Sequence, residues 1–339
     1  MEQRPFTYVS NQDVRAILTP ADAVRIARDT LVEHARGQVD WGDPRQANVK
    51  VRQSPTHYKM KGCVLHGIGV AGFRVVGLRR TDEGYAVAAH RPTKSVLLSD
   101  PLTGAFFGIV DERWAYGLRT GACAAVAIEA LMVPDATDLT IIGTGHMAYA
   151  TVQTVNEIMP LERIRVFSRS QDRREAFAAR LAQDLGITVE VMDSVEAAVR
   201  DAAVIVTATE AAQPIIHHEW LRPGAVVYAM GTNQECDTAS YDRMRFIADE
   251  RQQIEVCFEI KRWIEEGTYD PSMIEGDLAE VITGKIRRES ADDQFLVRSQ
   301  GLVTQDVAQA YWIYQQAVER GLGVDLEASL VDDFGADLF

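Results

Sequence analysis

The sequence predicts an α/β protein in which a doubly wound parallel sheet stands beside a second, mixed α+β domain. Short apolar runs alternate with helical stretches in the middle of the chain, which is typical of parallel strands buried under helices on both faces. A glycine-rich turn follows the first of these runs, whereas the opening third mixes one helix with several strand-like runs. Because one core rarely grows beyond roughly 250 to 300 residues, we expect two domains in the 339 residues, 1–134 with 305–339 and 135–304.

Composition and charge exclude several classes of protein. The chain is 47% hydrophobic and 25% charged, as in an average globular protein, and it has no run of about 18 apolar residues that could span a membrane. Its net charge of −14 disfavours nucleic-acid binding, and residues 1–14 lack the apolar core of a signal peptide. The four cysteines form no CxxC pair, which favours reduced thiols over a zinc site or a disulfide frame. We therefore expect a cytoplasmic protein without a bound metal, a membrane partner or a nucleic-acid partner.

Helix and strand signals give the elements of the first domain. Helical patterns cover residues 20–36, 113–131 and 304–320, and strand-like runs cover residues 46–53, 70–77 and 95–98. Pro20 suits the first turn of a helix and Gly37 suits its end, while Pro134 stops the alanine-rich second helix. The acidic segment after Val324 is expected to be poorly ordered.

The second domain is expected to alternate strand and helix. Its strand-like runs cover residues 139–142, 164–167, 189–192, 203–207, 225–230 and 246–248, and helical stretches cover residues 173–185 and 194–200. Runs this short and apolar indicate parallel strands that are covered on both faces.

A glycine turn joins the first of these strands to the following helix. It reads G-x-G-x-x-A and consists of Gly143, Thr144, Gly145, His146, Met147 and Ala148. The first glycine makes the tight turn, the second lets the backbone approach a pyrophosphate, and the small last residue lets the helix pack on the strand. The helix N-terminus adds amide N–H groups and the positive end of its dipole. The turn therefore predicts a Rossmann domain that binds a dinucleotide.

The end of the second strand indicates which dinucleotide is bound. The acidic residue that would hold the ribose 2′-hydroxyl of NAD is absent there, and Ser168, Arg169 and Ser170 stand in its place. A guanidinium between two hydroxyls suits a 2′-phosphate, so we expect NADP(H) as the preferred cofactor. The alternative is that Arg169 only stacks on the adenine, and that NAD(H) binds as well.

Four stretches of the chain form a recognisable set. They are Ala71-Gly72-Phe73-Arg74-Val75-Val76, Gly117-Leu118-Arg119-Thr120-Gly121-Ala122, the turn from Ile142 to Ala148, and Ser299-Gln300-Gly301-Leu302-Val303-Thr304-Gln305-Asp306. In this order and spacing they resemble the ornithine cyclodeaminase/μ-crystallin family, and the resemblance covers roughly residues 5 to 323.

The resemblance implies an N-terminal substrate-binding and dimerisation domain, completed by the last helix, with a Rossmann domain between. Members of the family act on small 2-amino acids or their imines with a nicotinamide cofactor. A homodimer is therefore expected. The resemblance also implies that cofactor contacts come from Thr120, Thr207, Thr209, Gly231 and Gly301.

In the family, two arginines and a lysine surround the carboxylate of the substrate. Arg45 and Arg119 match the two arginines, with Arg52 as a rival for the first, and guanidinium forks suit a carboxylate because they bind both oxygens. Arg74 stands at the position of the lysine, and arginine effectively cannot lose its proton. We expect Arg74 to help hold the carboxylate.

Another lysine is then needed as the proton donor. Lys61 lies one strand before Arg74 and could deliver an ammonium from the neighbouring strand, and Lys59 is a weaker candidate. Strand alternation puts both lysines on the same face, so the pattern leaves the choice open.

Asn233 stands where cyclodeaminases of the family have an aspartate. An amide cannot exchange a proton near neutral pH, although it can hydrogen-bond an imine or an amine. This disfavours cyclodeamination of ornithine but allows imine reduction, since the cofactor supplies the hydride.

The sequence therefore predicts an NAD(P)H-dependent oxidoreductase that reduces a small 2-imino acid to a 2-amino acid, or catalyses the reverse. One alternative is a redox-neutral amino-acid cyclodeaminase with bound NAD. A second alternative is a non-catalytic binder of cofactor and small ligand, of the μ-crystallin type.

Overall fold

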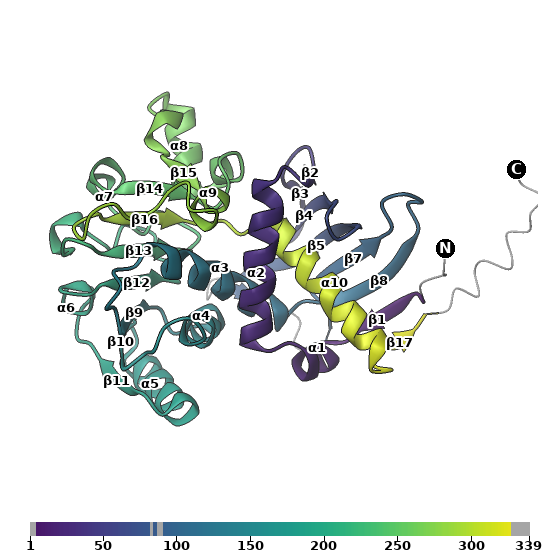
Figure 1. Ribbon diagram of the computed structural model, residues 1–339, viewed down its shortest axis with the longest axis horizontal. Helices are drawn as coiled ribbons and strands as arrows, with labels where there is room; N and C mark the ends of the chain where they lie inside the picture. The colour runs from purple at the N-terminus through teal and green to yellow at the C-terminus, as the bar shows by residue number, and fades with distance from the viewer. Residues whose placement is uncertain (1–4, 82–83, 87–90, 327–339) are drawn as a thin grey trace, which may run out of the picture. The chain divides into compact units, whose positions relative to one another are not determined.

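A computed structural model describes residues 5–81, 84–86 and 91–326, and within it the chain forms two compact units (Figure 1). The strand-rich unit takes its described residues from 1–19, 37–116 and 303–339, and the Rossmann unit consists of 20–36 and 117–302. These units differ from the expected domains, 1–134 with 305–339 and 135–304, at two helices. Helix α2 (Pro20–Ala35) and all but the first two residues of α3 (Ala115–Leu131) belong to the Rossmann unit. The physical reason is packing, since α2 contacts α4 (His146–Asn156) and α9 (Leu278–Ile282).

The strand-rich unit is built on one mixed sheet. Its strands are β1 (Thr7–Val9), β2 (Val39–Trp41), β3 (Ala47–Lys50), β4 (Thr56–Leu65), β5 (Val70–Thr81), β6 (Gly84–Ala86), β7 (Lys94–Ser99), β8 (Phe106–Asp111) and β17 (Val324–Asp325). Their order is β17-β1-β8-β7-β5-β4-β2, with β3 added to β4 and β6 added to β5. The pair β1–β8 is parallel and the other pairs are antiparallel.

Helix α10 (Val303–Glu319) covers one face of this sheet, which we call the inner face (Figure 1). Gly72 of β5 makes this close approach possible, because a Cβ there would lie 2.6 Å from a methyl carbon of Val307. Gly108 of β8 likewise allows the ring of Tyr314 of α10 to approach the sheet closely, because a Cβ there would press against that ring. The short helix α1 (Asn11–Ile17) also contacts α10.

The Rossmann unit contains an all-parallel sheet, as expected. Its strands are β9 (Asp138–Ile142), β10 (Arg163–Phe167), β11 (Thr188–Val191), β12 (Val204–Thr207), β13 (Val226–Ala229), β14 (Arg245–Ala248), β15 (Gly276–Asp277) and β16 (Phe295–Arg298). The order is β11-β10-β9-β12-β13-β16-β14-β15. Strand order therefore reverses between β9 and β12, which is where an open α/β sheet binds its ligand.

Helices cover both faces of the parallel sheet. The remaining helices of the unit are α5 (Gln171–Leu185), α6 (Val195–Val199), α7 (Thr238–Arg243) and α8 (Phe258–Glu266), with single 3₁₀ turns at His218–Trp220, Gln253–Val256 and Pro271–Met273. Helices α6, α7 and α8 share one hydrophobic core with alternate strand residues such as Ile205, Val227 and Phe246. No helix in the described part of the chain is long and apolar enough to cross a membrane.

The doubly wound parallel sheet beside a mixed α+β domain is confirmed, and the expected strands and helices of the Rossmann unit are present within a few residues of their predicted ends. Strand β16 was not predicted. It enters the sheet between β13 and β14, so its hydrogen-bond partners lie far from it along the chain. The acidic segment after Val324 was expected to be poorly ordered. Its first residue, Asp325, is paired with Thr7 in strand β17, and residues 327–339 lie outside the described residues.

Candidate functional site

The glycine turn after β9 has the geometry that the sequence predicted for dinucleotide binding. Gly143 has a φ of 117°, and a Cβ there would clash with the carbonyl oxygen of Ala208. Its N–H donates to the carbonyl of Phe167 at the end of β10 over 2.9 Å. Gly145 is the N-cap of α4, no side chain caps the helix, and the space beside Gly145 is open. The turn therefore fits a pyrophosphate, which would take up amide N–H groups of the first turn of α4.

The rest of the turn is placed by its packing. A Cβ at Gly117 of α3 would clash with Nε2 of His146, so the imidazole is directed at α3 within the Rossmann unit. Ala148 is fully buried, as helix-to-strand packing requires, while Thr144 and Met147 are half-buried.

The loop after β10 presents a cation and two hydroxyls, and no carboxylate. Arg169 is exposed, whereas Ser170 caps α5 by accepting from the N–H of Arg173. The hydroxyl of Ser168 donates to the carbonyl of Ser170, and Arg174 donates to the carbonyl of Ser168 over 3.1 Å. These bonds hold the loop, and Arg169 remains at its surface.

A buried carboxylate that the sequence analysis did not single out ties together the loops after β12 and β13. Glu235 accepts hydrogen bonds from the hydroxyls of Thr207 and Thr209, both at 2.6 Å, and from the N–H groups of Thr209 and Gly231 at 3.0 and 2.7 Å. Burial raises the pKa of Glu235, while the threonine hydroxyls oppose that rise. Three expected cofactor contacts, Thr207, Thr209 and Gly231, are thus gathered around one side chain.

Asn233 lies in the same loop as Glu235. Its side-chain amide donates to the carbonyl of Ala211 over 3.1 Å, which links the loop after β13 to the loop after β12. Its backbone carbonyl accepts from Arg298, whose guanidinium is fully buried and pairs with Glu259 at 2.5 Å. The position of Asn233 is therefore held from both sides.

Arg119 and Thr120 are buried in the second turn of α3, and the backbone of Gly301 lies against Arg119. Gly301 has a φ of 82°, and a Cβ there would clash with the guanidinium of Arg119. The buried carboxylate of Asp249 holds this loop, since it accepts from the N–H groups of Gln300 and Gly301 at 2.6 and 2.7 Å. Asp249 is a second residue that the sequence analysis missed, although it directly follows the apolar run of β14.

Lys61 and Arg74 form the centre of a charged cluster in the strand-rich unit. They are directly paired across β4 and β5, and only 9% and 8% of their surfaces are exposed. Arg74 forms ion pairs with Glu112 at 2.6 Å and with Asp306 at 3.4 Å, and these carboxylates keep the pKa of the buried guanidinium above its ordinary value. Its guanidinium also lies 5.0 Å from the centroid of the Tyr116 ring. Arg74, expected to hold the substrate's carboxylate, is thus already engaged with two carboxylates of its own unit.

The other cations expected at the site differ in their surroundings. Lys59 is half-buried on the same face as Lys61, as strand alternation predicted. Arg45 is also half-buried, with its guanidinium 4.4 Å from the ring centroid of Trp41. Arg52, its rival, is exposed in the turn between β3 and β4. These environments favour Arg45 over Arg52.

Glu112 and Asp306 were not recognised as site residues. Asp306 stood at the end of the last quoted motif, and it lies in the first turn of α10. Glu112 follows β8, a strand that the sequence analysis did not predict. The arginine at the position of the family's lysine could have pointed to these two acidic residues, because a buried guanidinium needs carboxylate partners.

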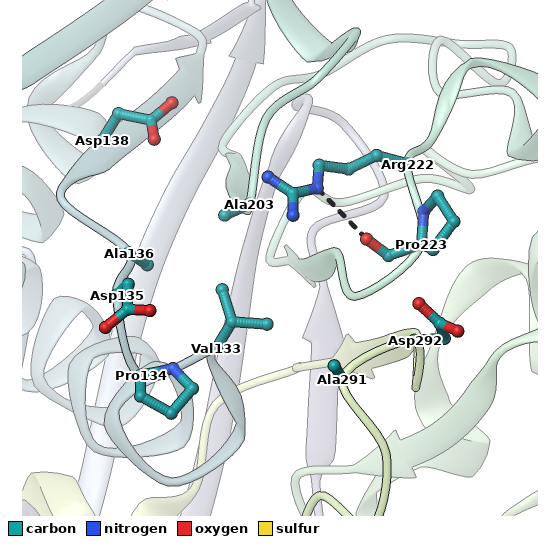
Figure 2. A pocket seen from close by; sticks show the side chains of 10 residues that line it. All are labelled: Val133, Pro134, Asp135, Ala136, Asp138, Ala203, Arg222, Pro223, Ala291 and Asp292. Atoms are coloured by element: carbon teal, nitrogen blue, oxygen red, sulfur yellow. Dashed lines mark hydrogen bonds between the residues drawn. The ribbon is translucent and has the colours of Figure 1, made fainter.

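A cavity of about 520 Å³ in the Rossmann unit lies away from the glycine turn (Figure 2). Figure 2 shows that its lining comes from residues at or before the starts of parallel strands, such as Asp138 of β9, Ala203 before β12, and Pro223 before β13. Ligands of open α/β sheets bind at the opposite, carboxyl ends of the strands. Among the residues that the structure describes, no group of three histidine, cysteine or acidic side chains could hold a metal ion.

Comparison with known proteins agrees with this architecture. The sequence profile of the ornithine cyclodeaminase/mu-crystallin family matches residues 9–321. A Delta(1)-pyrroline-2-carboxylate reductase of Bacillus cereus (strain ZK / E33L) is 28% identical over 271 residues, which cover 78% of this chain and 82% of the relative. The ketimine reductase mu-crystallin of Mus musculus is 30% identical over 234 residues, which cover 68% of this chain and 70% of the relative. The chain has the same fold as Thermococcus litoralis Delta(1)-pyrroline-2-carboxylate reductase, whose structure was solved in complex with NADH and L-proline. The TM-score is 0.86 at 22% sequence identity, and the match covers 94% of this chain and 100% of that chain.

Proposed function

Because the chain belongs to the ornithine cyclodeaminase/mu-crystallin family, we propose that it is a nicotinamide-dependent oxidoreductase that reduces a small 2-imino acid to the 2-amino acid, or catalyses the reverse. The observation that carries the proposal is the buried Lys61 ammonium paired with Arg74, in a chain that also has a dinucleotide-binding turn. The names of two relatives, a pyrroline-2-carboxylate reductase and a ketimine reductase, support imine reduction.

The cofactor is assigned to the Rossmann unit. When bound there, a reduced nicotinamide supplies the hydride that adds to the carbon of the C=N bond. The first turn of α4 would hold the pyrophosphate, and the loops gathered by Glu235 would supply Thr207 and Thr209. The exposed Arg169 favours the 2′-phosphate of NADP(H), since a guanidinium binds phosphate oxygens in pairs.

The substrate's carboxylate is assigned to the guanidinium groups of Arg45 and Arg119. Lys61 is assigned as the proton donor to the imine nitrogen, directly or through a water, because an ammonium can transfer a proton whereas the guanidinium of Arg74 effectively cannot. Asn233 is assigned to orienting that nitrogen.

Arg74 receives a positioning role. Its ion pairs with Glu112 and Asp306 fix β5 against the end of β8 and the start of α10. Because both carboxylates already bind the guanidinium, the ion pairs favour a role for Arg74 in positioning Lys61 over a direct contact with the substrate.

We also propose a homodimer formed through the outer face of the strand-rich sheet. Large apolar side chains are more than a third exposed on this face, opposite α10: Tyr58, Met60, Phe73, Val75 and Phe106. The rings of Phe73 and Phe106 touch edge to face. A contiguous exposed apolar patch of this kind is typical of an interface. Sedimentation tests the proposed dimer: the wild type should sediment as a dimer and the Phe73→Lys variant as a monomer.

The compartment proposed for the enzyme is the cytoplasm. All four cysteines (Cys63, Cys123, Cys236 and Cys257) are buried and none is in a disulfide, which suits a reducing environment.

The experiment that tests the function follows NADPH and NADH absorbance with the purified protein. Cyclic ketimine acids, and 2-oxo acids mixed with ammonia, are the substrates. Oxidation of the cofactor with one imine class supports the proposal. No oxidation, with ammonia released from ornithine or lysine, supports a cyclodeaminase instead, and nucleotide binding without either reaction supports a non-catalytic binder.

A further inference from the structure

The sheet of the Rossmann unit divides into two halves where its strand order reverses. Strands β9, β10 and β11 form the first half, and β12, β13 and β16 form the second. In sheets of this kind each half binds one mononucleotide. The glycine turn after β9 is assigned to the pyrophosphate and Arg169 after β10 to the 2′-phosphate, so the first half takes the adenosine end of the cofactor. The loops after β12 and β13 belong to the half that takes the nicotinamide end.

The carboxylate of Glu235 joins these two loops, and each of its four hydrogen bonds comes from a donor. Oε1 accepts from the hydroxyl and the N–H of Thr209, at 2.6 and 3.0 Å. Oε2 accepts from the hydroxyl of Thr207 and the N–H of Gly231, at 2.6 and 2.7 Å. A Cβ at Gly231 would lie 2.3 Å from the carboxyl carbon, so the carboxylate packs directly against this backbone. Glu235 is fully buried and therefore acts on a ligand only through the loops it holds.

The guanidinium of Arg298 complements Glu235 from the same buried region. It donates to the carbonyl groups of Ala229 and Asn233, over 3.3 and 3.4 Å. The positive charge of Arg298 also opposes the rise in the pKa of Glu235 that burial causes. The loop after β13 is therefore fixed through its N–H groups by Glu235 and through its carbonyl groups by Arg298.

Glu235 also determines what the hydroxyl of Thr209 can do. A threonine hydroxyl has one proton to donate and two lone pairs that accept. Thr209 donates its proton to Glu235 and accepts from the N–H of Ala211 over 3.2 Å, and its side chain is only half-buried. A ligand group that bonds to this hydroxyl must therefore be a donor. The nicotinamide end of the cofactor has two kinds of donor, the hydroxyls of its ribose and the NH₂ of its carboxamide.

We propose that Glu235 is a positioning residue for the nicotinamide end of the cofactor, which fixes the loops after β12 and β13 and leaves Thr209 as an acceptor there. The proposal rests on the proposed function, which requires a bound dinucleotide. Glutamine cannot replace Glu235, because each carboxylate oxygen accepts from one backbone N–H, and a backbone N–H can only donate. Whichever way the amide of a glutamine is turned, its NH₂ would face the N–H of Thr209 or of Gly231.

Calorimetric titration tests this by comparing a whole dinucleotide with its adenosine half: NADPH with adenosine 2′,5′-bisphosphate, and NADH with AMP. Glu235→Gln should weaken binding of the dinucleotide about ten-fold or more and change binding of the adenosine half less than about two-fold. A residue that only supports the fold would affect both ligands alike. Glu210→Gln is the matched control, because it is the same substitution on an exposed side chain next to Thr209, and its Kd values should equal those of the wild type.

Thr209→Val and Thr209→Ser test the acceptor while the buried carboxylate stays in place, and they decide the question if Glu235→Gln does not fold. The valine variant should weaken NADPH binding about ten-fold, whereas the serine variant keeps the hydroxyl and should bind like the wild type. Titration with 2′-phospho-ADP-ribose, which has the second ribose and no nicotinamide, identifies the donor. If Thr209→Val weakens its binding as much as that of NADPH, the donor is a ribose hydroxyl, and if not, it is the carboxamide. Both results support the proposal.

Two outcomes would overturn the proposal. One is an equal loss for the dinucleotide and its adenosine half in Glu235→Gln, and the other is dinucleotide binding that Glu235→Gln or Thr209→Val leaves unchanged. A wild type that binds the dinucleotide but reduces no imine would contradict the proposed function alone, because the titrations still decide about Glu235. A wild type that binds no dinucleotide would contradict both.

Discussion

Lys61 of β4 and Arg74 of β5 are directly paired across the antiparallel ladder, and both side chains are buried on the inner face of the sheet. The two cations differ in what they can do. Arg74 keeps its proton at every accessible pH and is bound to Glu112 and Asp306, whereas an ammonium can give its proton away. Within this cross-strand pair, Arg74 therefore has a fixed charge that stabilises the structure, whereas the ammonium of Lys61 has a proton that it can transfer.

Lys61→Met should lower kcat for imine reduction by about 10² to 10⁴, because a positioned proton donor contributes on this scale. KM should change much less. Lys261→Met is the control, since Lys261 is exposed on α8 and should leave both constants unchanged. Steady-state kinetics with NADPH in excess measure this, and an unchanged kcat would exclude Lys61 as the donor.

Gly301→Ala should raise KM for the imino acid about ten-fold or more, because the added Cβ would displace the guanidinium of Arg119. Gly284→Ala is a matched control. Gly284 has a φ of 74°, close to the 82° of Gly301, but no atom lies within 4 Å of the added Cβ. The two variants therefore share the backbone strain and differ in the contact. Equal KM values in the two variants would contradict the role of Arg119.

Arg169→Ala should weaken NADPH binding about ten-fold and leave NADH binding nearly unchanged, because only NADPH carries the phosphate that the guanidinium is assigned to hold. Fluorescence titration with both cofactors measures it. NADH serves as the internal control. An equal loss for both cofactors would mean that Arg169 stacks on the adenine instead.

Glu259→Gln should destabilise the Rossmann unit by about 3 to 5 kcal/mol at pH 7, because it leaves Arg298 buried without its counter-charge. Burial alone would raise the pKa of Glu259, but Arg298 holds it below its ordinary value. A carboxyl with a lowered pKa stabilises the fold above its unfolded pKa, and this contribution is lost as the pH falls through the folded pKa. The difference between variant and wild type should therefore shrink at low pH.

Urea denaturation at several pH values measures this effect. The control is the double variant Glu259→Leu with Arg298→Met, which removes both charges and should recover most of the lost stability. A double variant as unstable as the single one would show that packing, and not the unpaired charge, is responsible.

Part of the site could be predicted because its signals lie within a few neighbouring residues. The turn at Gly143 and Gly145 depends on backbone geometry that its own residues impose, and the structure shows the tight turn and the open helix N-terminus. The replacement of a lysine by Arg74 could also be recognised from the sequence, since Arg74 lies inside a recognisable motif.

Other parts could not be predicted, since they depend on residues that are distant along the chain. Strand β16 joins β13 and β14 only in the folded sheet. Glu235 reaches Thr207 and Thr209 across a loop whose path no local pattern specifies. The assignment of α2 to the Rossmann unit likewise follows from its contacts with α4 and α9.

The family, the doubly wound sheet and the turn that suits a dinucleotide could be predicted from the amino-acid sequence, because periodicity and glycine geometry act over short stretches of chain. Which charged side chains meet became visible in the folded chain. It paired Arg74 with Glu112 and Asp306, and it collected further lysines on the same face of the sheet. The physical reason is that the interaction of two charges depends on their separation and burial, which the fold alone sets.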